Sequence, residues 1–339
     1  MDGIGIAIYF DKIAGVDERI HLQQNAEGVQ AMGRYILGRM GYIIVTFLVI
    51  ATLTFLLMQT LPGSPFNDER LSETQKQRLA EKYKLDQPVP IQYGNYILNL
   101  LQGDLGDSYQ YDGRPVTKII AERIGPSVVL GAQALLVGTF LGLILGILAA
   151  LRHNSIIDYA AMVIAVLGLS IPSFVFAGLL QYWVGVRLQW LPVAFWEGFE
   201  YSILPTLSLS VFVTATMARY MRTEMLEVLS QDFIVMARAK GMSNFLIIIK
   251  HGLRNAMIPI ITVLGPMAVS LMTGTLVIEK IFSVPGLGEQ FIKSILTNDY
   301  SVIMGVTLFY SILFIVIVFV VDILYGWIDP RIRMSGRDR

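Results

Sequence analysis

Six long apolar windows constrain the fold of this chain more than any other feature of its sequence. A membrane-spanning helix needs about 20 largely apolar residues, and each window approaches or exceeds that length. The windows cover residues 41–61, 127–151, 159–183, 203–220, 257–278 and 302–327. The fourth is the weakest, because Ser and Thr interleave its apolar residues. We therefore predict an all-α integral membrane protein with six transmembrane helices.

The composition supports the membrane interpretation and narrows the chemistry. Only 15% of the 339 residues are charged, whereas soluble domains carry about 25%. The formal net charge is zero, so the overall charge gives no reason to expect a nucleic-acid partner. The sequence has no cysteine, which excludes disulfides, thiolate metal sites and cysteine nucleophiles.

Lysine and arginine in short loops predict the orientation of the spans. Arg34 and Arg39 precede the first window, and Arg152 lies between the second and the third. Six more basic residues lie at the end of the fourth window or between it and the fifth: Arg219, Arg222, Arg238, Lys240, Lys250 and Arg254. The short loops on the other side hold only Arg187, Lys280 and Lys293. This asymmetry places both termini in the cytoplasm. We expect Arg219 and Arg222, at the end of the fourth span, to extend toward the lipid headgroups.

The predicted domain organisation follows from the spans. Residues 1–32 form a cytoplasmic extension, because their short apolar run has no cleavage pattern of a signal peptide. Residues 33–127 hold the first span and an extracytoplasmic segment. Residues 128–333 form a five-span core with a cytoplasmic loop at 222–256, and residues 334–339 are a tail.

The long segment after the first span predicts a small outer cap of three helices. Residues 72–75 match a capping box that opens a helix ending before Pro88. Residues 91–101 form a second helix, which Gly103 ends. Residues 115–124 form a third helix that leads into the second span. The third helix carries an apolar stripe of Val116, Ile119, Ile120 and Ile124.

Prolines and glycines inside the spans predict kinks and close packing. Pro172, Pro205, Pro259 and Pro266 each remove a backbone donor and favour a kink. Gly138, Gly142 and Gly146 recur every four residues, which allows a neighbouring helix to approach closely.

The spans lack the groups that a self-powered transporter or an enzyme needs. A carrier driven by protons or sodium is expected to place carboxylates at mid-depth, but Asp322 lies near the end of the sixth span. Gln133 and Gln181 are polar but do not carry protons. No HExxH, G-x-S-x-G or nucleotide-binding glycine loop is present, so we predict no catalytic residue, no metal ligand and no cofactor bound by this chain. Energy for transport would then come from another subunit.

The loop between the fourth and fifth windows is the predicted place for that subunit to act. Phe233, Met236, Ala237 and Lys240 share one helical face, and Gly241 ends the helix. Such a helix suits a partner's cleft, and it suits the membrane surface equally well. Physics alone leaves both interpretations open.

A resemblance to a known family decides between these two interpretations of the loop helix. The sequence 237–241 (ARAKG), followed by 250–255 (KHGLRN) and Pro259, resembles the EAA loop of permease subunits in bacterial binding-protein-dependent ABC importers. The resemblance is to the peptide and nickel branch, and within it to the B-type subunit of oligopeptide and dipeptide permeases. Further strings agree in order at residues 55–63, 103–106, 115–116, 170–174, 190–192, 278–282, 285–288, 299–301 and 329–333. The resemblance implies a type I ABC importer permease fold. The sequence departs from the broad EAA motif at Val235 and Met236, where other branches of the family carry glutamate and alanine.

The resemblance also implies roles for residues. In this family the loop helix docks on a cytoplasmic ATPase subunit. The implied ATPase-coupling residues are Phe233, Ala237, Ala239 and Gly241 at the contact, with Arg238 and Lys240 as polar anchors. The implied pathway residues are Gln133, Ser170, Pro172 and Pro259, in a channel shared with a second permease. The kinks near Pro172 and Pro259 are candidate gates of this channel, although a static kink explains Pro172 equally well.

The resemblance implies partners as well. They are a homologous permease subunit, two ATP-binding subunits that hold ATP and Mg, an extracytoplasmic binding protein, a peptide substrate and membrane lipids. The expected location is the bacterial cytoplasmic membrane. Dipeptides, nickel or glutathione remain alternatives to oligopeptides, and a secondary carrier, a channel or a structural membrane protein are more distant ones.

Overall fold

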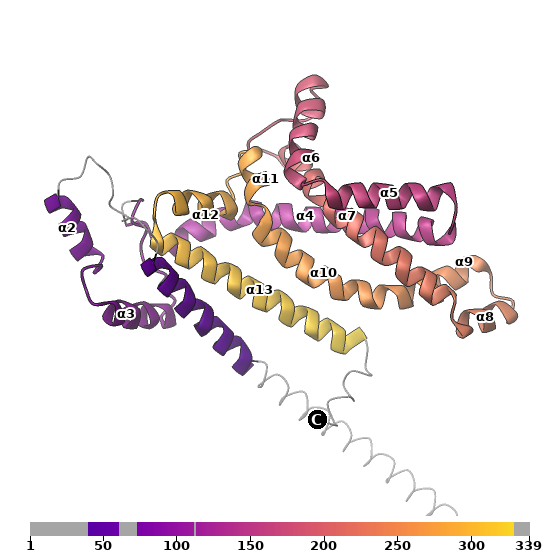
Figure 1. The fold of residues 1–339 in the computed structure, drawn as a ribbon, viewed down its shortest axis with the longest axis horizontal. Helices are drawn as coiled ribbons and strands as arrows, with labels where there is room; N and C mark the ends of the chain where they lie inside the picture. The colour runs from indigo at the N-terminus through magenta and orange to yellow at the C-terminus, as the bar shows by residue number, and fades with distance from the viewer. Residues whose placement is uncertain (1–39, 61–72, 112, 329–339) are drawn as a thin grey trace, which may run out of the picture. The chain divides into compact units, whose positions relative to one another are not determined.

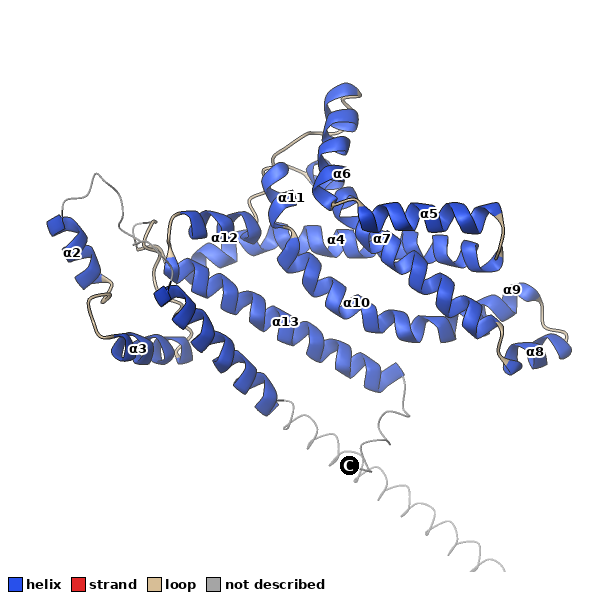
Figure 2. Ribbon diagram, in the orientation of Figure 1, coloured by secondary structure: helices blue, strands red, loops and turns tan. Residues whose placement is uncertain are grey.

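The fold is helical throughout the residues that the computed structural model describes, which are 40–60, 73–111 and 113–328. Figure 2 shows helices and loops but no strand in these ranges, where the only β-type pairing is an isolated bridge between Asp107 and Pro115. The chain divides into two compact units, Met1–Leu53 and Thr54–Arg339. The predicted N-terminal extension, the residue Ser72 of the capping box and the C-terminal tail lie outside the described residues.

The first helix covers Met40–Thr60, and the remaining elements follow in the order labelled in Figure 1. They are α2 (Glu73–Lys82), α3 (Val89–Leu101), α4 (Val116–Leu151), α5 (Ile156–Ser170), α6 (Ser173–Leu180), the π-helix η1 (Gln181–Arg187), α7 (Phe199–Leu229), α8 (Asp232–Ala239), α9 (Asn244–Ile247), the π-helix η2 (Ile248–Leu253), α10 (Arg254–Gly274), α11 (Leu276–Ile281), α12 (Leu287–Leu296) and α13 (Tyr300–Ile328).

Five helices are long and apolar enough to cross a membrane, and a bent pair brings the number to six when it is counted as one span. The five are Met40–Thr60, Val116–Leu151, Phe199–Leu229, Asn244–Leu271 and Tyr300–Val320. The prediction of an all-α membrane protein is therefore confirmed, and the described helices are consistent with six spans. Most helices extend beyond the predicted windows, because apolar windows do not detect the polar turns at helix ends.

The third span differs from its prediction. Residues 159–183 do not form one straight helix, because the chain turns by 101° between Ile156–Ser170 and Ser173–Arg187. Ile171 precedes Pro172 and is extended, with φ −89° and ψ 122°, as the proline ring requires of its neighbour. Pro172 also has no N–H to continue the helix. Pro126, Pro205, Pro259 and Pro266 lie inside helices that continue through them.

The predicted glycine stripe forms the contact between α4 and α7. A Cβ added to Gly138 would lie 2.4 Å from Val213 Cβ, and one added to Gly142 would lie 2.7 Å from the carbonyl oxygen of Thr214. Gly146 meets α7 in the same way, at the carbonyl oxygen of Ala218. The two backbones approach so closely that only glycine fits, which confirms the packing role of the stripe.

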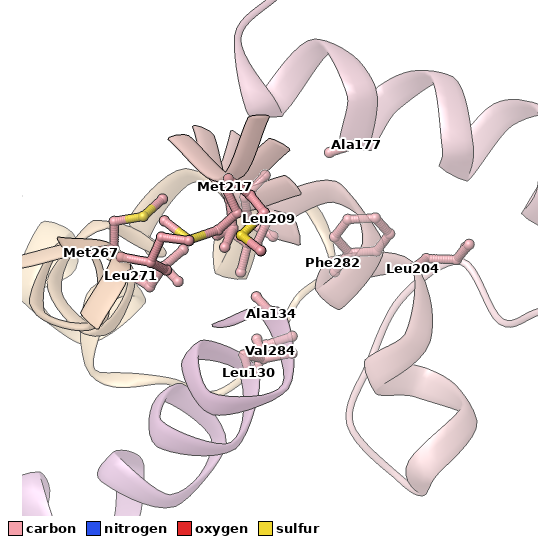
Figure 3. Close-up of a cluster of buried hydrophobic side chains, with 14 of the residues drawn as sticks. Leu130, Ala134, Ala177, Leu204, Leu209, Met217, Met267, Leu271, Phe282 and Val284 are labelled. Carbon is pink, nitrogen blue, oxygen red and sulfur yellow. The ribbon is translucent and has the colours of Figure 1, made fainter. Parts of the chain in front are cut away.

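The main hydrophobic core joins α4, α7 and α10 around sulfur-containing and branched side chains (Figure 3). Its labelled members are Leu130, Ala134, Ala177, Leu204, Leu209, Met217, Met267, Leu271, Phe282 and Val284. Phe282 and Val284 follow α11, so this core also holds the connection that leads to α12.

A second cluster confirms the apolar stripe at the start of α4. Val116, Ile119 and Ile120 are buried against Leu287 of α12 and against Val302 and Val306 of α13, with Ile124 packed beside them. The predicted third cap helix and the second span are one continuous helix, since Pro126 does not interrupt it.

Candidate functional site

In the chain, the short helix α8 follows the long helix α7 and precedes the consecutive elements α9, η2 and α10 (Figure 1). Gly241 has φ +74°, a left-handed conformation that glycine adopts without strain. Its N–H donates to the carbonyl oxygen of Arg238 (2.9 Å), and the N–H of Met242 donates to that of Ala237 (3.3 Å). These bonds close the end of α8, so the prediction that Gly241 ends the helix is confirmed.

The side chains of α8 divide into an inward and an exposed set. Ile234 and Ala237 are buried and pack with Ile247, with Met242 beside them. Phe233 is 40% exposed and Met236 58%. Arg238, Ala239, Lys240 and Gly241 are also exposed.

The predicted face is therefore wrong at Ala237, which lies inside the loop instead of on its surface. The apolar pair that fixes α8 on the rest of the chain is Ile234 and Ala237, at i and i+3. Ile234 was absent from the predicted face because its burial partner, Ile247, comes from the next helix. Ala237 then supports the position of α8 and leaves its exposed neighbours to meet a partner.

An ion pair fixes the start of α5 to the last part of α7. Arg222 donates from Nε to Asp158 Oδ1 (2.5 Å) and from Nη2 to Asp158 Oδ2 (2.8 Å). His153 Nδ1 lies 3.1 Å from Asp158 Oδ2, and the N–H of Asn154 donates to the same oxygen. The side chain of Asp158 is only 1% exposed. The expectation that Arg222 extends toward headgroups is wrong, because a buried carboxylate 64 residues away holds its guanidinium.

The four predicted pathway residues lie in three parts of the fold: α4, the bend between α5 and α6, and α10. Gln133 on α4 accepts a hydrogen bond from Thr206 on α7 (2.8 Å). Ser170 and Pro172 lie at the bend between α5 and α6, where the hydroxyl of Ser170 donates to the carbonyl oxygen of Val166. Pro259 lies inside α10. Only Pro172 of the four lines the hollow between the α5–α6 bend and α7, together with Gly168, Leu169, Ile171, Ser173, Phe176, Val211 and Phe212.

A buried carboxylate, Glu279 of α11, joins α4 to the loop before α12. It accepts hydrogen bonds from Ser127 Oγ (2.7 Å), Thr275 Oγ1 (2.6 Å) and the N–H of Glu289 (3.1 Å). A Cβ at Gly286 or Gly288 would lie 2.3 Å or 2.9 Å from this carboxylate. The family resemblance singled out residues 278–282 and 285–288 but gave no sign that Glu279 of the first segment is buried against the glycines of the second.

A second buried carboxylate, Asp299, anchors the segment between α3 and α4. It accepts hydrogen bonds from Ser108 Oγ and from the N–H of Tyr109. Gln110 donates to the carbonyl oxygen of Thr297 (2.9 Å). Burial raises the pKa of Tyr109, so its phenol stays neutral at physiological pH. The segment is therefore packed on the α12–α13 connection and is not a free tether.

These features define a class of protein: a multi-spanning helical membrane protein in which two long helices are joined through a short, partly exposed helix. Residues 142–334 match the family described as "Binding-protein-dependent transport system inner membrane component". The chain belongs to this family, the permease subunits of ABC importers.

Similar proteins lie in the peptide branch of the family. The chain is 46% identical over 307 residues to the dipeptide transport system permease protein DppB of Bacillus subtilis, covering 90% of this chain and 100% of that protein. It is 42% identical over 305 residues to the oligopeptide transport system permease protein OppB of Haemophilus influenzae, covering 89% and 100%. Among solved structures, it matches the inward-facing MetNI methionine ABC transporter with a TM-score of 0.53 and 18% identity, covering 62% of this chain and 96% of that one. This last match shows a shared fold and confirms the predicted fold class.

Proposed function

We propose that this chain is a transmembrane subunit of an ATP-driven peptide importer and forms half of its translocation pathway. The observation that carries the proposal is the placement of α8: a short, partly exposed helix that follows α7 and is held by Ile234 and Ala237 against Ile247. Its relatives named as dipeptide and oligopeptide permeases support a peptide as the cargo.

Helix α7 is long enough to transmit a movement of the ATPase subunits into the membrane. Its 31 residues span about 46 Å at 1.5 Å per residue, whereas the hydrocarbon core of a membrane is about 30 Å thick. One end of α7 therefore extends beyond the lipid and carries α8. The glycine contact with α4 and the Asp158–Arg222 pair with α5 make the three helices move together.

In the proposed mechanism α4, α5 and α7 move as one group, and this group ends at the bend at Pro172. Closure of two ATPase subunits on ATP would draw α8 toward its counterpart in a second permease. Helices α4, α5 and α7 would follow, and the angle at residues 171–172 would change because no backbone hydrogen bond spans the proline. Phe233, Arg238, Ala239, Lys240 and Gly241 are proposed to contact the ATPase subunit, with Ala237 supporting them from within.

The proposed assembly has this chain in the cytoplasmic membrane with both termini in the cytoplasm. It holds one homologous permease, two ATP-binding subunits that form a heterodimer and carry ATP and Mg, and an extracytoplasmic binding protein. Gln133, Ser170, Pro172 and Pro259 are proposed as pathway residues in the channel between the two permeases. Oligopeptides are the proposed cargo, with dipeptides, nickel and glutathione as alternatives inside the same family.

Reconstitution of the complex in liposomes tests this function. We expect uptake of a labelled oligopeptide only when the ATPase subunits, ATP and the binding protein are all present. Uptake by the chain alone that stops with an uncoupler and ignores ATP would identify a secondary carrier and contradict the proposal. Competition by unlabelled dipeptide, nickel or glutathione ranks the alternative cargoes.

Gly241→Leu is expected to uncouple transport from ATP hydrolysis. A Cβ at Gly241 meets no atom within 4 Å, so the variant adds backbone strain without a clash. A left-handed leucine costs about 1–2 kcal/mol, which favours a different exit from α8 and so a different orientation of its exposed face. Peptide uptake per ATP hydrolysed should fall about tenfold, while assembly and peptide capture remain, because 1.4 kcal/mol corresponds to a factor of ten.

Gly241→Asn is the matched control, because asparagine tolerates the left-handed conformation better than other non-glycine residues. We expect it to retain most of the coupling. Normal uptake by Gly241→Leu would refute the coupling role of this turn.

A further inference from the structure

Helix α3 exposes a continuous apolar face in the segment predicted to lie outside the membrane. Ile91, Leu98 and Leu101 are 52%, 58% and 75% exposed. With Gly94 they occupy positions i, i+3, i+7 and i+10, which lie on one side of a helix. None of the thirteen residues of α3 is buried. This face therefore has no partner among the residues that the structure describes in this chain.

The other side of α3 is attached to the end of the first membrane helix. Phe55 packs on Tyr93 and Tyr96, with ring centroids 5.4 Å and 5.5 Å apart. Gln59 donates a hydrogen bond to Gln92 (3.1 Å). Phe55 and Gln59 belong to the last two turns of the helix that ends at Thr60. These contacts place α3 at the depth where a membrane span reaches the headgroups.

The charges change abruptly between α2 and α3. Five of the ten residues of α2 (ETQKQRLAEK) are charged, and none of the thirteen residues of α3 (VPIQYGNYILNLL) is. Helices that face water on one side normally carry charges there. Tyrosine beside apolar residues is typical of the boundary between lipid and water. The composition thus indicates different surroundings for two neighbouring helices.

We propose that α3 is an interfacial helix, with Ile91, Leu98 and Leu101 immersed in the outer leaflet of the membrane. A water-soluble binding protein would be a poor occupant, because it leaves in every transport cycle and would expose three large apolar side chains to water each time. Transient protein interfaces are also about as polar as ordinary surface. Lipid covers the face permanently, and contact with it stabilises the position of α3 beside the first span.

Nitroxide labels test this placement directly, because the natural sequence contains no cysteine that would have to be removed. Leu98→Cys and Leu101→Cys place a label at two exposed positions, so either one can serve if the other variant assembles poorly. The labelled chain is reconstituted in liposomes together with partner subunits from which reactive cysteines have been removed. Accessibility is then measured to oxygen, which concentrates in lipid, and to a water-soluble nickel chelate.

We expect both labels to be several-fold more accessible to oxygen than to the nickel chelate. Gln77→Cys on the charged, exposed helix α2 is the aqueous control and should show the reverse. Asn99→Cys, next to Leu98 on the polar side of α3, should give an intermediate ratio.

Three results would overturn the proposal. A label at residue 98 that prefers the nickel chelate would place the face in water. Protection that develops only when the binding protein is added would make the face a docking site for that protein. Inaccessibility to both reagents would place it against another subunit. The measurement requires no transport, so it is independent of the proposed cargo and coupling.

Discussion

Gly142→Leu is expected to destabilise the protein more than any other single substitution in the membrane region. A Cβ at residue 142 would lie 2.5 Å from the Cβ of Met217 and 2.7 Å from the carbonyl oxygen of Thr214. A helix carbonyl does not move alone, so α4 and α7 would have to separate. Overpacking of this kind costs about 3 kcal/mol, which corresponds to roughly 4 °C in the midpoint of thermal unfolding for a chain of 339 residues. Tryptophan fluorescence of the purified chain in detergent measures the change.

Gly178→Leu on α6 is the matched control for this prediction. It makes the same chemical change inside a helix, but a Cβ at residue 178 meets no atom within 4 Å. Its midpoint should stay within about 1 °C of that of the natural protein. Equal midpoints for the two variants would mean that α4 and α7 are not in the close contact described above.

Arg222→Ala is expected to have the second largest effect, on stability and on transport together. It leaves the carboxylate of Asp158, 1% exposed, with only His153 and the N–H of Asn154 as partners. Because Asp158 keeps these two partners and Arg222 is itself 23% exposed, we expect the loss of the pair to cost about 2 kcal/mol. We also expect uptake per ATP hydrolysed to fall, because α5 would no longer follow α7.

Two further arginine variants separate this effect from a general loss of charge. Arg219→Ala removes an exposed arginine one turn earlier on α7 and should change little. Arg222→Lys keeps the charge but not the two-pronged geometry, so it should restore only part of the loss. The double variant Asp158→Asn with Arg222→Ala should cost less than the sum of the single changes, since the two residues interact. Identical results for Arg219→Ala and Arg222→Ala would contradict a special role for the pair.

Features that depend on neighbouring residues in the sequence could be predicted well. Apolar windows located the spans, because a helix in lipid must satisfy its own backbone and cover itself with apolar side chains. The repeat of glycine at residues 138, 142 and 146 predicted a close helix contact. Gly241 predicted the end of α8, since the geometry of a helix end involves only a few adjacent residues.

Features that depend on distant residues could not be predicted. Nothing near Arg222 indicates that Asp158 will meet it, and Asp158 by itself resembles an ordinary acidic residue in the first turn of a helix. The inward position of Ala237 depends on Ile247, which follows a turn. Pro172 indicated a kink. Four other prolines, however, lie in helices that continue through them, so the presence of a proline predicts neither whether the chain bends nor by what angle. The assignment of residues to coupling and to the pathway stays a prediction.

The loop around Glu279 restricts how this part of the sequence can change during evolution. Residues 286 and 288 pass so close to the carboxylate that even a methyl group at residue 286 would lie 2.3 Å from it. A shorter side chain at 279 would leave an empty space, and a larger one at 286 or 288 would have no room. Neither change is tolerated alone, although a smaller residue at 279 and an added methyl group at 286 could compensate each other. We therefore expect these three positions to change together or not at all, however freely the exposed residues beside them vary.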